Sequence, residues 1–436
     1  MIFHKSIDKD FYYTLINQGW RFVSGPIMLF CIPLFLTAAE QGYWYTFASL
    51  AALSVFADFG FTFIVLQFSA HAFAPLKIRS QERTLCGSEE DLIKLSTFYT
   101  FSIKWALVTI FFVFPIIAIY GYYFLQTNNT IVNWQWPWII YVIATTLQFF
   151  VTVQRNFFEG CDSVSITRRM DTVANIISSS CSITILYSGG ALYALAISVL
   201  IGPIIESVLL FYYFKPIIKQ MLIIAHRNHY SWFKEFTGLL WKYAVSWISA
   251  YFLVQFIVPV SFKYFGAIEA GKIGFTIALL NAMSNFSRTW IFAITPKLNI
   301  FVENRQWKKL HTLFMRNNML SLYTFAVFFV LLIIGMIYLG DYINSFSRLA
   351  NFKAVIIMGF TWFGQLYYLN GTAYLRAFKQ EPLMQYNVIQ AVIAVILTYL
   401  CAIKLSADYL FLGSLFVNII MMMVTFLYIK KQRRNT

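Results

Sequence analysis

Long apolar stretches alternate with short polar connections along the chain. Twelve such stretches fall at about 11–36, 43–68, 98–125, 137–157, 172–187, 191–213, 238–262, 272–295, 317–339, 352–372, 384–403 and 408–429. An α-helix needs about 20 mainly apolar residues to cross the hydrocarbon core of a bilayer. The first stretch is too long for the apolar region of a signal peptide, so we expect it to be retained as a helix. The pattern predicts an all-α polytopic membrane protein with about twelve transmembrane helices.

The composition agrees with this pattern and excludes several other classes of protein. Hydrophobic residues make up 59% of the chain and charged residues only 12%, whereas a soluble domain is about 25% charged. Too few polar residues remain to cover a surface in water, which excludes a soluble enzyme, a disordered chain and a nucleic-acid-binding module. An outer-membrane barrel would give a much weaker apolar signal in each segment.

The positive charges are distributed unevenly between the two sides of the predicted membrane. The 436 residues carry a net charge of +15, from 33 Lys and Arg against 18 Asp and Glu. When successive connections are assigned to alternate sides, 25 of the Lys and Arg fall on the side of both termini and five on the other. Because Lys and Arg gather in cytoplasmic loops, both termini are predicted to be cytoplasmic. Three cations remain inside predicted spans: Arg21, Lys104 and Arg288.

Weak similarities between the two halves of the chain indicate an internal repeat. EQGYWYT at 40–46 resembles EAGKIGFT at 269–276, and IKLSTFYT at 93–100 resembles KKLHTLFM at 308–315, in the same order in both halves. The alternative is chance similarity between apolar helices. A repeat predicts two six-helix lobes, 1–213 and 238–436, joined by a cytoplasmic linker at 214–237. Two such lobes suit a transporter with a central cavity between them.

Charged residues inside a membrane span are costly and usually face a bundle interior or a water-filled cavity. Arg21 and Asp58 both lie about ten residues from the inner ends of their helices, at roughly the same depth. The two side chains could form a structural tie between helices, or one or both could face the cavity.

Four predicted helices carry a stripe of polar residues on one face. The stripes are Gln148, Thr152, Arg155 and Glu159; Asp171, Asn175, Ser178 and Ser182; Asn281, Asn285 and Arg288; and Thr361, Gln365, Tyr368 and Thr372. They indicate either an internal hydrated cavity or interhelical hydrogen bonds that hold the bundle together. Two stripes contain an arginine, which favours the cavity.

The intramembrane charges are biased towards cations, which suits an anionic substrate such as a phosphate ester. Candidate substrate-binding residues are Arg21, Lys104, Arg155 and Arg288, although Lys104 could instead extend to the inner surface. Candidate polar residues of the cavity are Gln148, Asn281, Asn285 and Gln365.

Two acidic residues are candidates for ion coupling. Glu206 follows Gly202 and Pro203, where a kink is expected, and Asp58 is the rival candidate. The alternative for either is a structural acid with satisfied hydrogen bonds. No phosphate-binding loop of the GxxxxGK[ST] type and no Cys/His metal spacing occurs, so we expect no cofactor and leave coupling to H⁺ or Na⁺ open. The scattered cysteines are read as small buried hydrophobic residues.

Three segments resemble bacterial O-antigen flippases. They are LTAAEQGYWYTFASLAALSVFADFGFTFIVLQFSAH at 36–71, FFEGCDSVSITRRM at 157–170 and YLRAFKQEPLM at 374–384, in the expected order. This family is part of the multidrug, oligosaccharidyl-lipid and polysaccharide exporter superfamily. The resemblance implies twelve helices in two six-helix lobes that operate by alternating access in the bacterial inner membrane.

The resemblance also implies a substrate and partners. It implies transport of an undecaprenyl-diphosphate-linked O-antigen repeat unit from the cytoplasmic to the periplasmic leaflet, beside other O-antigen assembly proteins. Arg21, Arg155 and Arg288 would then bind the diphosphate or acidic sugars. One alternative is a small-molecule exporter of the same superfamily, whose cavity should be neutral or acidic. Another is a membrane glycan polymerase or ligase, which the sequence disfavours because the outer loops offer few acid/base residues beyond Glu40, Glu269 and Asp341.

Overall fold

Helices make up nearly all the regular structure of the protein. The computed structural model describes residues 2–79, 83–128, 131–228, 230, 232–233, 244, 248–249, 251–253, 255–340, 342, 344–378 and 383–435. The chain divides into two compact units, each treated separately below. Unit 1 comprises Met1–Cys31 and Leu50–Ile248, and unit 2 comprises Ile32–Ser49 and Ser249–Thr436. The chain therefore passes from one unit to the other within its first helix and returns within its second.

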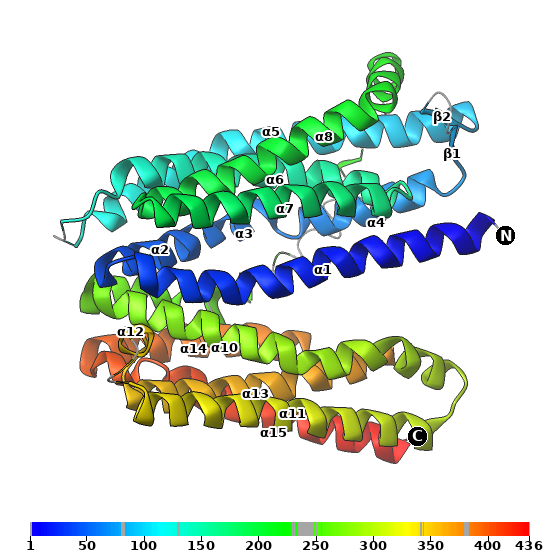
Figure 1. Ribbon diagram of the computed structural model, residues 1–436. Helices are drawn as coiled ribbons and strands as arrows, with labels where there is room; N and C mark the ends of the chain where they lie inside the picture. Colours follow the sequence, from blue (N-terminus) through cyan, green and yellow to red (C-terminus); the bar gives the residue numbers. More distant parts are fainter. Residues whose placement is uncertain are drawn as a thin grey trace. The chain divides into compact units, whose positions relative to one another are not determined.

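The elements follow one another in the order that Figure 1 colours from blue to red. In the first half they are α1 (Ile2–Phe35), α2 (Ala38–Ala51), the 3-10 helix η1 (Ala52–Ser54), α3 (Val55–Asp58), α4 (Phe61–Phe73), β1 (Lys77–Arg79), β2 (Thr84–Cys86), α5 (Glu89–Leu125), α6 (Gln135–Gly160), α7 (Val164–Tyr187) and α8 (Leu192–Arg227). In the second half they are α10 (Ile257–Glu303), α11 (Trp307–Tyr338), α12 (Asn344–Ser347), α13 (Phe352–Ala377), α14 (Met384–Lys404), the 3-10 helix η2 (Ala407–Tyr409) and α15 (Leu412–Asn435).

The lengths and apolar composition of these helices confirm a polytopic membrane protein. Within the described residues, seven helices are long and apolar enough to cross a membrane, and the bent pair α2–α3 and α4 adds an eighth if it forms one span. Three further helices, α1, α7 and α13, have 34, 24 and 26 residues. At 1.5 Å per residue even the shortest of these reaches about 36 Å. All three helices carry polar side chains that are described below.

The second predicted span, 43–68, is interrupted rather than continuous. Phe59 and Gly60 both adopt left-handed backbone conformations, with φ of 46° and 79°. The helices on the two sides of this break are bent by 44°. Asp58 stabilises the start of α4, because Thr62 donates to its carboxylate from both the backbone N–H (2.9 Å) and the side-chain hydroxyl (3.0 Å).

A small β-hairpin follows α4, in a loop that the apolar pattern left without structure. β1 and β2 pair antiparallel, with Ile78 opposite Leu85. Gln220 of α8 donates to the Leu85 carbonyl at 2.9 Å and accepts from the Leu85 N–H at 2.7 Å. The hairpin is thereby fixed to the end of α8.

The core of unit 1 is aromatic. In Figure 1, α6 lies beside α8, and α6 also packs on α4 and α5 while α7 packs on α8. Phe158 of α6 stacks on Phe214 of α8, with ring centroids 3.9 Å apart and planes 9° from parallel. Phe61 and Phe98 are completely buried in the same core. α1 is joined to α7 through polar contacts, which form the candidate site.

A close approach of two backbones organises unit 2. Gly42 of α2 packs directly on Ala267 of α10, and a Cβ at Gly42 would lie 1.9 Å from the Ala267 carbonyl oxygen. Gln41 donates to the Gly271 carbonyl at 2.9 Å. These residues belong to the two segments whose sequences suggested a repeat, EQGYWYT and EAGKIGFT. Gly266 interrupts α10 with a φ of 87°, near the middle of the predicted connection 263–271.

The predicted lobe boundaries stay a prediction. α8 continues to Arg227, so the first part of the predicted linker 214–237 is helical. Much of the remainder, and much of the predicted span 238–262, lies outside the described residues.

Candidate functional site

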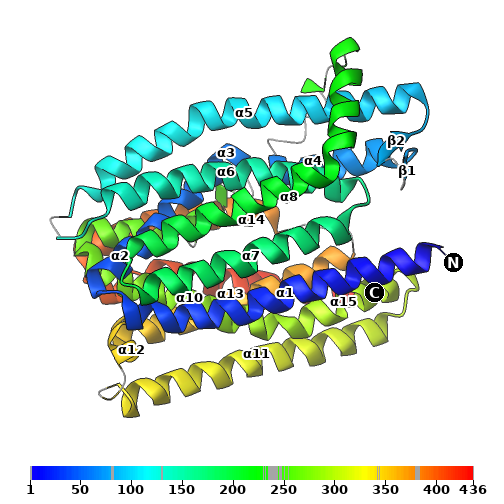
Figure 2. The same ribbon diagram turned by 45° about the horizontal axis from the view of Figure 1, so that its top comes forward.

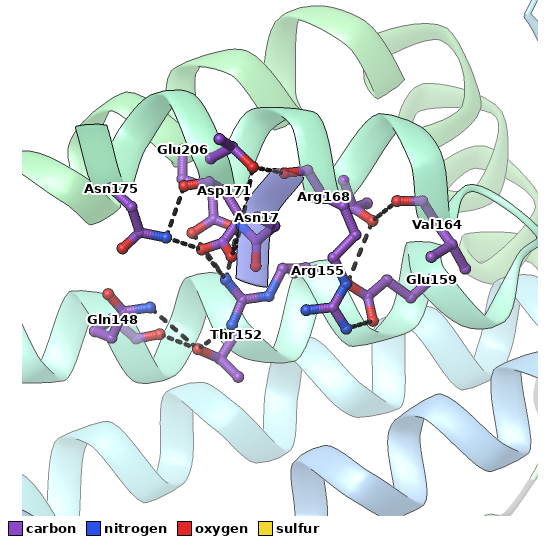
Figure 3. A network of polar contacts seen from close by, with 12 residues as sticks. Asn17, Gln148, Thr152, Arg155, Glu159, Val164, Arg168, Asp171, Asn175 and Glu206 are labelled. Carbon is purple, nitrogen blue, oxygen red and sulfur yellow. Dashed lines mark hydrogen bonds and ion pairs between the residues drawn. The ribbon is translucent and has the colours of Figure 1, made fainter. Parts of the chain in front are cut away.

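The largest group of connected charges lies within unit 1, where four helices contribute to one network (Figure 3). α6 presents its predicted polar stripe, and Arg155 is the third of the four residues in that stripe. Its Nη1 donates to Asp171 Oδ1 at 2.9 Å and to the two oxygens of Glu206 at 3.0 and 3.2 Å. One guanidinium therefore bridges carboxylates from α7 and α8.

Asp171 is the hub of this network. Besides Arg155, its carboxylate accepts hydrogen bonds from Arg21 Nη2 at 2.8 Å, from Asn17 Nδ2 at 2.9 Å and from Asn175 Nδ2 at 3.0 Å. A carboxylate has about four acceptor positions, and here four donors fill them. Asp171 therefore connects α1, α6 and α7 at a single point.

Glu206 is more deeply buried and has fewer donors. Its side chain is 2% exposed. Arg155 is its hydrogen-bond donor within the described part of the chain. α8 is continuous through Pro203, which lies inside the helix. Glu206 thus depends on one cation that it shares with Asp171.

A second ion pair extends the network. Arg168 Nη2 donates to Glu159 Oε2 at 3.0 Å, and Thr167 donates to the other oxygen of Glu159 at 3.3 Å. Gln148 donates to the Thr152 hydroxyl at 3.3 Å, so it belongs to the same face of α6.

The network is electrically balanced. Its three arginines, at 21, 155 and 168, meet three acids, at 159, 171 and 206. The cationic excess expected from the intramembrane residues is therefore absent from this group of residues. Of its two central arginines, Arg21 has a side chain 47% exposed and Arg155 one that is 12% exposed. Arg21 is thus the more accessible to a ligand.

The structure gives Arg21 a different partner from the one considered in the sequence, and it adds one residue to the site. Arg21 binds Asp171, not Asp58, whose two oxygens are engaged by Thr62. Of the two alternatives for Arg21 and Asp58, the tie between them is therefore not formed in this structure. Asn17 was missed by the sequence analysis, although its position four residues before Arg21 places both on one face of a helix.

Arg288 of unit 2 differs from the arginines of unit 1. It is half-buried, and its guanidinium carbon lies 4.7 Å from the centre of the Phe292 ring. Its Nε is buried without a hydrogen-bond partner, and no carboxylate lies within ion-pair distance among the described residues. A second cation, Arg376 of α13, repels the positive charge of Arg288. Among the described residues, Arg288 therefore carries a positive charge without an acid partner, unlike Arg21, Arg155 and Arg168 of unit 1.

The other predicted polar residues of unit 2 differ in their surroundings. Asn281 accepts a hydrogen bond from Trp362 Nε1 at 3.0 Å, while Asn285 is exposed on the same helix. Gln365 is half-buried. A buried cluster that the stripes did not include joins α11 and α13, where Asn370 donates to Asn318 and Ser321 at 3.0 Å each.

Lys104 is separate from both groups. It is exposed on α5 and lines a basic groove between α5 and α8. No group of three or more His, Cys, Asp or Glu with the geometry of a metal site occurs in the described residues.

Two acids considered for glycan chemistry have local structural contacts. Glu40 and Thr37 form a capping box at the start of α2, with each backbone N–H bound by the other side chain at 2.8 and 3.3 Å. Glu269 pairs with Lys272 at 2.7 Å. Asp341 lies outside the described residues.

Comparison of the fold with solved structures identifies transporters. An inward-facing multidrug resistance MATE family transporter of the MOP superfamily matches with a TM-score of 0.61, at 13% identity over 94% of this chain and 98% of that one. The lipid II flippase MurJ, in an inward closed conformation, matches with a TM-score of 0.57, at 14% identity over 98% of this chain and 87% of that one. No protein-family model and no curated protein sequence matches. The chain therefore shares its fold with these two proteins.

Proposed function

We propose that the protein is a flippase for an anionic, lipid-linked oligosaccharide, with an undecaprenyl-diphosphate-linked O-antigen repeat unit as the substrate. The likeness of its fold to that of a lipid II flippase supports this class of substrate. The sequence resemblance of 36–71, 157–170 and 374–384 supports the O-antigen unit in particular. The lobes 1–213 and 238–436 would alternate between inward-open and outward-open states about the linker 214–237.

The observation that carries the proposal is the uncompensated charge of Arg288. Its guanidinium lies over the ring of Phe292, its Nε has no hydrogen-bond partner, and Arg376 adds a second positive charge. Such a group is suited to bind an anion. Arginine can bind phosphate oxygens through two parallel hydrogen bonds, which are strong where water is excluded. In this account Arg288 binds the diphosphate, and the half-exposed Arg21 provides a second contact.

Arg155 has a different place in this account. Its charge is shared between Asp171 and Glu206, so we propose that it positions Asp171 and, through it, Arg21. The substrate needs no bond to break, because the protein only lowers the cost of moving a charged head group through the bilayer. The polyprenyl chain would remain in lipid.

We propose Glu206, rather than Asp58, as the group that couples transport to an ion. The oxygens of Asp58 are held by Thr62 at the start of a helix. Glu206 has a single shared cation, so binding of H⁺ or Na⁺ to its carboxylate would release Arg155 towards Asp171 alone. This would change the attachment of α1 to the rest of unit 1.

The positive-inside distribution supports an orientation. We propose that the protein resides in the bacterial inner membrane with both termini in the cytoplasm, where O-antigen assembly proteins would supply its substrate. Its partners are then lipids and lipid-linked sugars.

A small-molecule exporter is the second candidate function. The charge balance within unit 1 and the likeness to a multidrug MATE transporter favour it. Drug resistance conferred by the protein without any effect on surface glycan would support this candidate over the flippase.

The test is complementation of a flippase-deficient strain, scored by surface O-antigen at matched protein abundance. We expect Arg288→Ala to abolish display and Arg288→Lys to restore it in part. Arg316→Ala, which removes an exposed arginine from α11, is the matched control and should behave as wild type. Normal display by both Arg288 variants would refute the role of this cation.

A further inference from the structure

A basic groove on unit 1 lies outside the site described above. It has a volume of about 850 Å³ and lies between α5 and α8. Its lining residues include Lys104, Lys215, Lys219, His226 and Arg227, and none of the lining residues that the structure describes is acidic. In Figure 2, the end of α8 lies beside α5 within unit 1. The groove therefore concentrates positive charge, and no carboxylate from the described part of its lining offsets that charge.

The positions of the lysines place the groove at one membrane surface. Lys104 lies 21 residues before the end of α5, and Lys215 lies 23 residues after the start of α8. At 1.5 Å per residue these distances are about 32 and 35 Å, close to the thickness of the hydrocarbon core. If the opposite ends of α5 and α8 lie at the far surface, the lysines lie at the level of lipid head groups. The distribution of loop charges assigns this level to the cytoplasmic leaflet.

The faces that carry the lysines continue as apolar faces towards the membrane interior. On α5 the face with Thr100 and Lys104 continues with Leu107 and Phe111, and Phe111 is 74% exposed. On α8 the face with Lys219 and Lys215 continues with Phe211 and Val208, which are 58% and 63% exposed. Each helix thus presents cations followed by exposed apolar side chains.

The opposite face of α8 is occupied. Phe214 and Met221 are completely buried, and Gln220 holds the β-hairpin. The end of α8 is therefore fixed to unit 1 on one side, while its lysine-bearing face is left uncovered by protein in the described part of the chain.

We propose that this groove is a binding site for one anionic phospholipid of the cytoplasmic leaflet, such as phosphatidylglycerol. Lys104, Lys215 and Lys219 bind the phosphate, and the acyl chains lie along Phe111 and Phe211. Basic pockets between membrane helices on the cytoplasmic side are suited to anionic head groups. An amphiphile satisfies both parts of the groove, whereas a free phosphate would leave the apolar faces unused.

The test uses the full-length protein, purified in mild detergent and exposed to phosphatidylglycerol or phosphatidylcholine before native mass spectrometry. We expect one phosphatidylglycerol to be retained in preference to phosphatidylcholine. The triple variant K104Q/K215Q/K219Q should weaken this retention by at least about tenfold. K308Q/K309Q/K430Q, which removes three exposed lysines from unit 2, should retain the lipid as wild type does. The variant K104R/K215R/K219R, which preserves the positive charges, should also retain the lipid. If the triple glutamine variant does not fold, the single variant K104Q replaces it in the same measurement.

Four outcomes would overturn the proposal. The first is equal retention of the two phospholipids, and the second is unchanged retention of phosphatidylglycerol by a folded glutamine variant. The third is that glycerol 3-phosphate protects the protein against thermal unfolding as well as phosphatidylglycerol does. The fourth is that undecaprenyl phosphate displaces the bound lipid at lower concentrations than phosphatidylglycerol does. The third would indicate a site for free phosphate esters, and the fourth a site for the polyprenyl substrate. Each readout is independent of transport, so loss of lipid binding and loss of flipping can be distinguished.

Discussion

Arg155 shows why a buried cation need not be a ligand-binding residue. It lies 2.9–3.2 Å from oxygens of Asp171 and Glu206, and all three side chains are largely buried. Removing one member of a buried ion pair leaves an uncompensated charge, which is more costly than replacing the whole pair. The first consequence of changing Arg155 should therefore be structural.

We predict that Arg155→Ala destabilises the protein by about 3–5 kcal/mol. Thermal unfolding in detergent and abundance in the membrane measure this effect. The double variant R155A/E206Q should be less destabilised than the sum of its single changes, because the neutral amide no longer needs a cation. Wild-type stability of Arg155→Ala would show that the network has no structural role.

Glu206 carries the second prediction at this scale. If it couples transport to protons, Glu206→Gln should make the flipping rate independent of an imposed pH gradient while the protein still folds. Asp58→Asn is the comparison, and it should retain the dependence even if stability falls. A wild-type response to the gradient in the Glu206 variant would exclude this carboxylate as the coupling group.

At the scale of elements, the apolar pattern located most helices but not their contacts. The predicted span 137–157 corresponds to α6 at Gln135–Gly160. α5 begins nine residues before its predicted span 98–125, because Ser88 caps a polar first turn by accepting from the Asp91 N–H. The spacing of apolar residues along the chain predicts neither the break at Phe59–Gly60 nor the β-hairpin. The pairing of Arg21 with Asp171 joins positions 150 residues apart, which a local pattern cannot specify.

The close packing of α2 on α10 gives a prediction for these elements. Gly42→Leu would place side-chain atoms against the Ala267 backbone, which cannot rotate away as a side chain can. Overpacking of this kind typically costs about 1–3 kcal/mol, so we expect a lower thermal midpoint. Gly25→Ala, where a Cβ meets nothing within 4 Å, should leave the midpoint unchanged or slightly raised. Equal midpoints for Gly42→Leu and wild type would contradict the packing.

At the scale of the whole molecule, the charge of +15 has two components. Most cations lie in predicted cytoplasmic connections, and their distribution is the basis for the predicted orientation. A few have separate roles: Arg21 and Arg155 are balanced by acids, Lys104 belongs to the basic groove, and Arg288 has no acid partner in the described residues. The sequence could identify these cations as exceptional, but only their neighbours distinguish one role from another.

The orientation leads to a prediction that is independent of substrate. Alkaline phosphatase fused after Gly189, between α7 and α8, should be active because this connection is predicted to be periplasmic. The same enzyme fused after Arg227 should be inactive, and green fluorescent protein fused to the C-terminus should fluoresce. The reverse pattern would contradict the assigned topology.

The most direct test of the central claim is flipping by the purified protein in liposomes. A fluorescent undecaprenyl-diphosphate-linked oligosaccharide, placed in both leaflets, would be scored by its accessibility to a membrane-impermeant quencher. Wild type and Arg316→Ala should equilibrate the lipid at the same rate. Arg288→Ala should be about ten- to hundredfold slower, as expected for loss of a hydrogen bond to a charged group. Equal rates for Arg288→Ala and wild type, or no flipping by wild type, would contradict the account.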